Sequence, residues 1–219
     1  GELFHVDTTS LACTATGWHS SNGLTQFGMG FSTNTVGGTD DTLYVAGGAA
    51  VGASSSTLAK LDTGAFTATT VGTVQGWPEL TGNGNAELWG WFPSDEFGTT
   101  TPSVQKIDKT TGQPITTYML PSLQAPPTAW AFAFWGGDYW IFLATDTSPT
   151  TTVYQIDGTN GMKKSTTPTS GRTIVARDNP KPSSDPPRTA APASTASRYS
   201  VRCDCATAFA AVLTAMSLV

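Results

Sequence analysis

The sequence predicts an all-β fold built from repeated antiparallel units. A β-prone run that ends in an apolar residue, an aspartate and a turn occurs four times in 219 residues. The four aspartates lie 46 to 55 residues apart and are Asp7, Asp62, Asp108 and Asp157. A repeat of that length, filled with short strands, is typical of propeller blades. With 23 glycines and only 12% charged residues, the chain predicts three whole propeller-like units plus a half unit.

The half unit comes first in the chain, and one whole unit follows it. The half unit has expected strands at residues 2–6 and 11–16, joined through Asp7. The first whole unit has expected strands at residues 27–32, 42–46, 57–61 and 68–74. An aspartate carboxylate can accept hydrogen bonds from backbone N–H groups two residues on, so Asp62 suits the turn between the last two strands.

Two further whole units complete the body. The second has expected strands at residues 79–82, 86–92, 103–107 and 115–120. The third has expected strands at residues 129–135, 139–144, 152–156 and 162–166. In the third unit large aromatic residues alternate with alanine from Ala129 to Trp135, a pattern typical of a strand buried on both faces. Gly136-Gly137 predicts the hairpin turn that follows.

The C-terminal part differs from the body in composition. We assign residues 1–176 to the repeat domain and residues 177–219 to a tail rich in Pro, Ser and Ala, which we expect to be disordered. Every arginine lies between Arg172 and Arg202, so a tail that is not native, translated in a shifted frame, is one interpretation. The apolar end at residues 206–219 is too short for an ordinary transmembrane helix. The end of a lipid-anchor signal is the other interpretation.

Several segments resemble a known group of proteins. The motif in residues 104–112 and 153–161 resembles the outer hairpin of secreted bacterial β-propeller repeats. Residues 25–31, 79–92 and 130–142 are similar to segments of uncharacterised exported bacterial proteins, some of them lipoproteins. The resemblance covers residues 2–176 and implies a secreted or cell-surface location with no established reaction. A net charge of −5 disfavours nucleic acid as a partner.

The three cysteines are Cys13, Cys203 and Cys205. Ordering a tail costs conformational entropy without a packed site to receive it. We therefore predict that Cys13 is not bridged to either tail cysteine, and that the half unit stays open or pairs between chains.

Four tryptophans beside expected turns are candidate ligand-binding residues: Trp18, Trp77, Trp89 and Trp91. Aromatic rings at the loop ends of a rigid scaffold can stack on a glycan or a protein ligand. The alternative is that these rings form the core between units. With two histidines and no strong catalytic motif, we expect a binding protein without catalytic activity or a cofactor.

Four oxygen-bearing residues form a candidate metal site: Glu79, Asn83, Asn85 and Glu87. Carboxylate and amide oxygens suit Ca²⁺, so the alternative function is a calcium-dependent propeller hydrolase of the lactonase type. The competing interpretation is structural, because Asn83-Gly84-Asn85 is also a tight-turn sequence.

Overall fold

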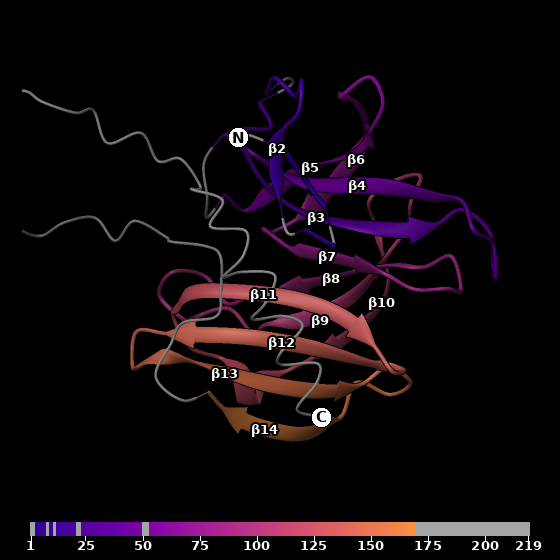
Figure 1. The fold of residues 1–219 in the computed structure, drawn as a ribbon. Helices are drawn as coiled ribbons and strands as arrows, with labels where there is room; N and C mark the ends of the chain where they lie inside the picture. The colour runs from indigo at the N-terminus through magenta and orange to yellow at the C-terminus, as the bar shows by residue number, and fades with distance from the viewer. Residues whose placement is uncertain (1–2, 8, 11, 21–22, 50–52, 170–219) are drawn as a thin grey trace, which may run out of the picture.

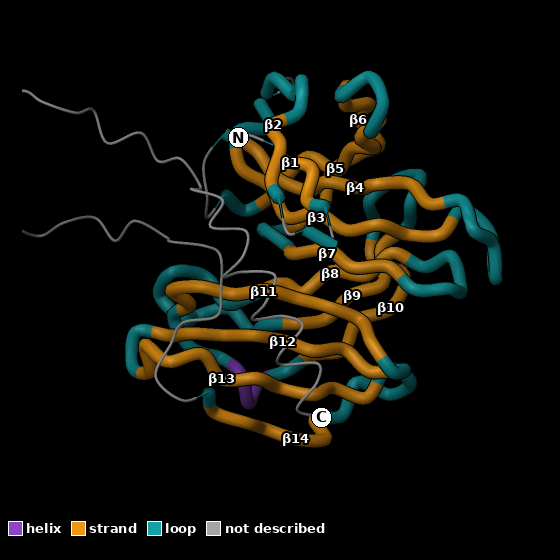
Figure 2. Tube along the Cα trace, in the orientation of Figure 1, coloured by secondary structure: helices purple, strands orange, loops and turns teal. Residues whose placement is uncertain are grey.

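The computed structural model describes residues 3–7, 9–10, 12–20, 23–49 and 53–169 (Figure 1). In this part of the chain the regular structure is almost entirely β (Figure 2), with one short 3₁₀ turn, η1 (Pro121–Leu123). The strands form four antiparallel sheets, three of four strands and one of two. The all-β prediction and the grouping into three larger units and one smaller unit are confirmed.

Each sheet contains strands that follow one another in the chain, as Figure 1 shows. The two-stranded sheet pairs β1 (Phe4–Val6) with β2 (Cys13–Ala15). The first four-stranded sheet holds β3 (Gln26–Thr33), β4 (Asp41–Gly48), β5 (Ser55–Asp62) and β6 (Thr67–Gln75). The second holds β7 (Glu79–Gly82), β8 (Leu88–Phe92), β9 (Ser103–Ile107) and β10 (Pro114–Met119). The third holds β11 (Pro127–Trp135), β12 (Asp138–Thr145), β13 (Ser148–Asp157) and β14 (Lys163–Pro168).

The four aspartates form the turns that the sequence predicts. In each turn the aspartate Oδ1 accepts a hydrogen bond from the backbone N–H two residues on, over 2.7–3.0 Å. The residue four positions after Asp108 is Gly112 with φ +79°, and the equivalent after Asp157 is Gly161 with φ +72°. Glycine suits this left-handed backbone, whereas Phe66 occupies the same position after Asp62 at φ +52°.

Three apolar clusters lie between successive sheets, because strand residues alternate between the two faces. In β4, Leu43 and Val45 belong to the cluster with Leu3 and Trp18, which flank the β1–β2 hairpin, and Tyr44 and Ala46 belong to the cluster with the second sheet. The third cluster joins the second and third sheets and is rich in aromatic residues. Each four-stranded sheet therefore contributes to the core shared with its neighbour.

The first strands of the three larger sheets lie next to one another, with β3 beside β7 and β7 beside β11. Glycine residues make the contact between β3 and β7 possible. A Cβ on Gly30 would lie 2.7 Å from the Leu80 backbone, and a Cβ on Gly82 would lie 2.2 Å from the Phe31 carbonyl oxygen. Larger residues at these positions would push β3 and β7 apart.

One expectation is corrected, and others fall outside the described residues. The structure has Cys13 in a disulfide, so the prediction that it is unbridged is wrong. Its partner lies outside the described residues, as do the tail at 177–219 and Cys203 and Cys205. In the part of the chain that the structure describes, no helix is long and apolar enough to span a membrane.

Candidate functional site

A half-open surface depression of about 450 Å³ lies beside the β1–β2 hairpin. We call it the hairpin pocket, and it is lined by Leu3, Phe4, Ala15, Thr16, Trp18, His19 and Ser20. Its volume falls within the range that small-molecule sites in proteins occupy. Both strands of the hairpin and the segment after β2 therefore contribute to one concave site.

Hydrogen bonds hold the segment after β2 against β1. The backbone N–H and the hydroxyl of Thr16 both donate to the Leu3 carbonyl oxygen, at 3.0 and 2.9 Å. The Thr16 hydroxyl oxygen then accepts a hydrogen bond from the Trp18 backbone N–H at 3.2 Å. Trp18 packs edge-on against Phe27 of β3, with ring centroids 5.8 Å apart. The pocket wall is therefore fixed to the first large sheet.

The pocket combines an apolar wall with an accessible polar rim. Leu3 and Trp18 are buried, Phe4 is half-buried, and His19 and Ser20 are exposed. The indole N–H of Trp18 is buried and has no hydrogen-bond acceptor among the described residues. Apolar side chains, an imidazole and a hydroxyl therefore all line the same pocket.

The other three candidate tryptophans are core residues. Trp77, Trp89 and Trp91 are 5%, 4% and 0% exposed and belong to the cluster between the second and third sheets. Trp89 stacks on Tyr118 at 5.6 Å. Their burial favours the interpretation that these rings form an inter-sheet core. Trp18 is also a core residue, in the cluster with Leu24 and Leu43, and it lines the hairpin pocket as well.

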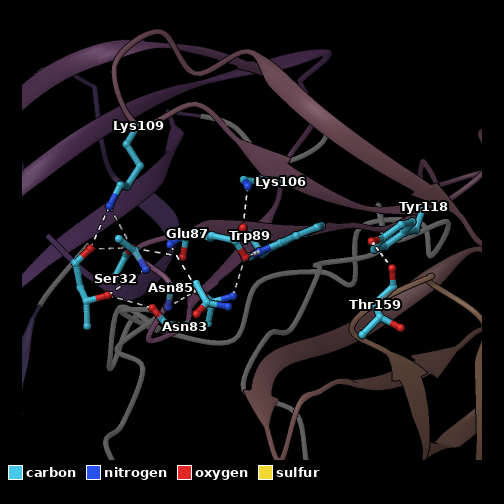
Figure 3. A network of polar contacts seen from close by, with 11 residues as sticks. Ser32, Asn83, Asn85, Glu87, Trp89, Lys106, Lys109, Tyr118 and Thr159 are labelled. Atoms are coloured by element: carbon cyan, nitrogen blue, oxygen red, sulfur yellow. Dashed lines mark hydrogen bonds and ion pairs between the residues drawn. The ribbon is translucent and has the colours of Figure 1, made fainter. Parts of the chain in front are cut away.

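Glu87 is the centre of a polar network on the second sheet (Figure 3). Its carboxylate forms an ion pair with Lys106 at 2.5 Å and accepts hydrogen bonds from the Asn83 side chain and the Trp89 indole at 2.7 and 3.1 Å. Burial alone would raise the pKa of Glu87, but these donors outweigh it and the pKa is lowered. The carboxylate is therefore ionised and engaged by protein groups.

The four candidate metal ligands do not converge. Asn83 accepts hydrogen bonds from the backbone N–H groups of Asn85 and Glu87, which is the role of a turn residue. Glu79 lies at the opposite end of the β7–β8 hairpin, paired with Trp91. Among the described residues, no group of three or more His, Cys, Asp or Glu side chains is placed to hold a metal ion. The geometry favours the tight-turn interpretation of this segment.

Tyr139 of β12 is the most strongly perturbed ionisable group of the aromatic core. Burial raises its pKa first, and the charge of Glu87 and the neighbouring Tyr118 raise it further. Tyr139 packs against Trp89, Phe132 and Phe134 at centroid distances of 4.9 to 5.7 Å. The residue is a neutral core tyrosine at physiological pH.

Sequence reasoning missed most of the hairpin pocket. His19 and Ser20 carry no motif, and the only available signal was a polar segment directly after the half unit. No family model matches the chain, and no curated protein matches it either. Function is therefore inferred from the geometry of the described residues.

Proposed function

We propose that this chain is a secreted or cell-surface binding protein of propeller-like architecture, without catalytic activity, that takes a small saccharide in the hairpin pocket. The observation that carries the proposal is the pocket itself, with its apolar wall at Phe4 and Trp18 and its exposed polar rim. Sugars present apolar ring faces and outward hydroxyls, which match an aromatic wall beside hydrogen-bonding groups.

The propeller-like part of the proposal is supported by the sheet arrangement. The first strands of successive sheets are neighbours, and the cores lie between successive sheets. Such a scaffold positions its loops, and binding residues are disproportionately placed on loops of this kind. The hairpin pocket is at the N-terminal end of this series of sheets.

The test is a titration of the protein with a panel of monosaccharides and disaccharides. Binding is measured by tryptophan fluorescence and by calorimetry. Replacing His19 with Ala or Ser20 with Ala should weaken binding by about 5- to 10-fold each, because each removes one hydrogen bond. Thr117→Ala is the matched control, since Thr117 is exposed on β10 and does not line the pocket.

Two outcomes would contradict the proposal. One is that no saccharide binds the native chain at millimolar concentration. The other is that binding is unchanged in both His19→Ala and Ser20→Ala, which would place the ligand elsewhere. A parallel calorimetric titration with Ca²⁺ addresses the calcium-dependent alternative, and heat of binding that Glu87→Gln abolishes would favour it over the saccharide proposal.

A further inference from the structure

The β1–β2 hairpin corresponds to the third and fourth strands of the complete sheets. Each third strand ends in the aspartate turn: Asp7 after β1, and Asp62, Asp108 and Asp157 at β5, β9 and β13. Strands β5, β9 and β13 are each paired on both edges. Among the described strands, β1 pairs with β2 alone. Within the described part of the chain, one edge of β1 therefore has no counterpart of the strand that lies beside β5, β9 and β13.

Hydrogen-bond alternation shows which residues face that edge. The Asp7 N–H donates to the Ala12 carbonyl at 2.9 Å, and the Thr16 N–H donates to the Leu3 carbonyl at 3.0 Å. In an antiparallel pair alternate residues bond across to the partner strand. Leu3 and Asp7 bond toward β2, so Phe4 and Val6 direct their N–H and C=O groups to the open edge.

The equivalent positions in the complete sheets always pair with apolar or small residues. Counting back from the aspartate, Val6 corresponds to Leu61, Ile107 and Ile156, and these pair with Leu43, Leu88 and Tyr139. Phe4 corresponds to Ala59, Gln105 and Tyr154, and these pair with Val45, Gly90 and Ile141. The open edge therefore fits an antiparallel strand with apolar residues at alternate positions.

Strand β1 itself has this pattern, because Phe4 and Val6 flank His5. We propose that two copies of this chain pair through β1, antiparallel about a two-fold axis at His5. Phe4 of one copy then lies opposite Val6 of the other, and the strand order β2-β1-β1-β2 gives an antiparallel sheet with the same number of strands as the larger sheets. The interface is self-complementary, as a two-fold dimer requires. It does not depend on the saccharide proposal.

The first test uses a matched pair of proline variants of the full chain. The Val6 N–H faces the open edge, whereas the Ala15 N–H faces the outer edge of β2, so Val6→Pro blocks the proposed pairing and Ala15→Pro does not. Sedimentation should show a concentration-dependent dimer for the native chain and for Ala15→Pro. Val6→Pro should associate about 30-fold more weakly, because two hydrogen bonds are lost per dimer.

A second test keeps the backbone intact and reports the register. The exposed His5 side chains of the two copies lie directly opposite one another, so His5→Glu and His5→Lys should each weaken the homodimer by like-charge repulsion. Mixing the two variants should restore a heterodimer. A monomeric native chain, a Val6→Pro dimer as strong as the Ala15→Pro dimer, or a mixture that stays monomeric would each overturn the proposal. A monomer cross-linked within one chain would assign the edge to residues 170–219 instead.

Discussion

The two interfaces of the second sheet are built in different ways. Toward the first sheet, glycines let backbones approach: the positions of Gly28, Gly30 and Gly82 leave no room for a Cβ between β3 and β7. Toward the third sheet, β7 and β11 are linked instead by a side chain, the Thr81 hydroxyl, which accepts a hydrogen bond from the Phe134 N–H at 3.2 Å. The adjoining core is mainly aromatic. One sheet thus combines a close backbone contact on one face with bulky ring packing on the other.

The aspartate turns show the same contrast. The turn after Asp108 docks on the first sheet through a cation, because Lys109 Nζ donates to the Ser32 hydroxyl and the Thr33 carbonyl at 3.3 and 2.9 Å. The turn after Asp157 docks on the second sheet through an aromatic ring, with the Tyr118 hydroxyl donating to the Thr159 carbonyl at 3.1 Å. Equivalent turns therefore reach the preceding sheet by different chemistry, which lets the two interfaces be perturbed separately.

The largest expected effect is at the aromatic interface. Trp91 is completely buried there, and Trp91→Ala should lower the free energy of unfolding by about 3–5 kcal/mol through lost burial and an unfilled cavity. Denaturant unfolding measures the change. Trp135→Ala is the control, since Trp135 is 45% exposed and its loss should cost about 0.5 kcal/mol or less.

Leu88 makes this prediction a test of the comparison. It is on the same strand as Trp91, is equally buried, and belongs to the cluster with the first sheet. We expect Leu88→Ala to cost less than Trp91→Ala because a smaller side chain is removed. A Leu88→Ala variant that is as unstable as Trp91→Ala would show that the aromatic interface is not the stronger one.

The next effect is at the glycine contact. Gly82→Ala should destabilise the protein by roughly 1–3 kcal/mol, because the added Cβ would overlap the Phe31 carbonyl and force β3 away from β7. Gly84→Ala is the matched control two residues away, since nothing lies within 4 Å of a Cβ there. Thermal unfolding of the two variants measures the difference. Equal midpoints would mean that β3 and β7 separate at no cost.

The sequence predicted the strand grouping because the signal is local. Repeat length, aspartate turns and alternating apolar residues depend on neighbours in the chain, and the third unit follows its expected boundaries closely. Gly136 and Gly137 have positive φ, at +62° and +86°, as the hairpin prediction requires. The steric requirement for glycine at positions 30 and 82 was not predictable, because it depends on which strands of different sheets become neighbours.

The site was less predictable than the fold for the same physical reason. A tryptophan beside a turn can face solvent or a neighbouring sheet. Trp77, Trp89 and Trp91 are buried because the second and third sheets pack against each other. Asn83 and Glu87 are close in the sequence, but Lys106, the ion-pair partner of Glu87, is on a different strand. The hairpin pocket depends on how the segment after β2 folds back on Leu3, which no local pattern encodes.

The smallest expected effect is the loss of stability at low pH that comes from the turns at Asp108 and Asp157. The pKa of Asp157 is lowered to about 2, first by the Thr159 hydroxyl, then by the Thr159 backbone N–H and by Lys164, whose Nζ lies 3.1 Å from the carboxylate. The pKa of Asp108 is also lowered, by hydrogen bonds from Thr110, but its neighbour Lys109 contacts Ser32 and Thr33 instead. A carboxylate with a depressed folded pKa stabilises the protein above its unfolded pKa of about 3.9 and loses that contribution as the pH falls toward 2.

Substitution of Asp157 by Asn removes this titration. The native chain should therefore be more stable than Asp157→Asn at pH 6, and the difference should shrink between pH 5 and pH 2. The same comparison for Asp108→Asn should depend on pH in the same direction and less on salt, because the Asp157 turn includes the Lys164 ion pair. Urea midpoints measured across this pH range at low and high salt give both quantities. A stability difference between the native chain and Asp157→Asn that grows as the pH falls would reverse the sign of the linkage and contradict the hydrogen-bonded carboxylate at this turn.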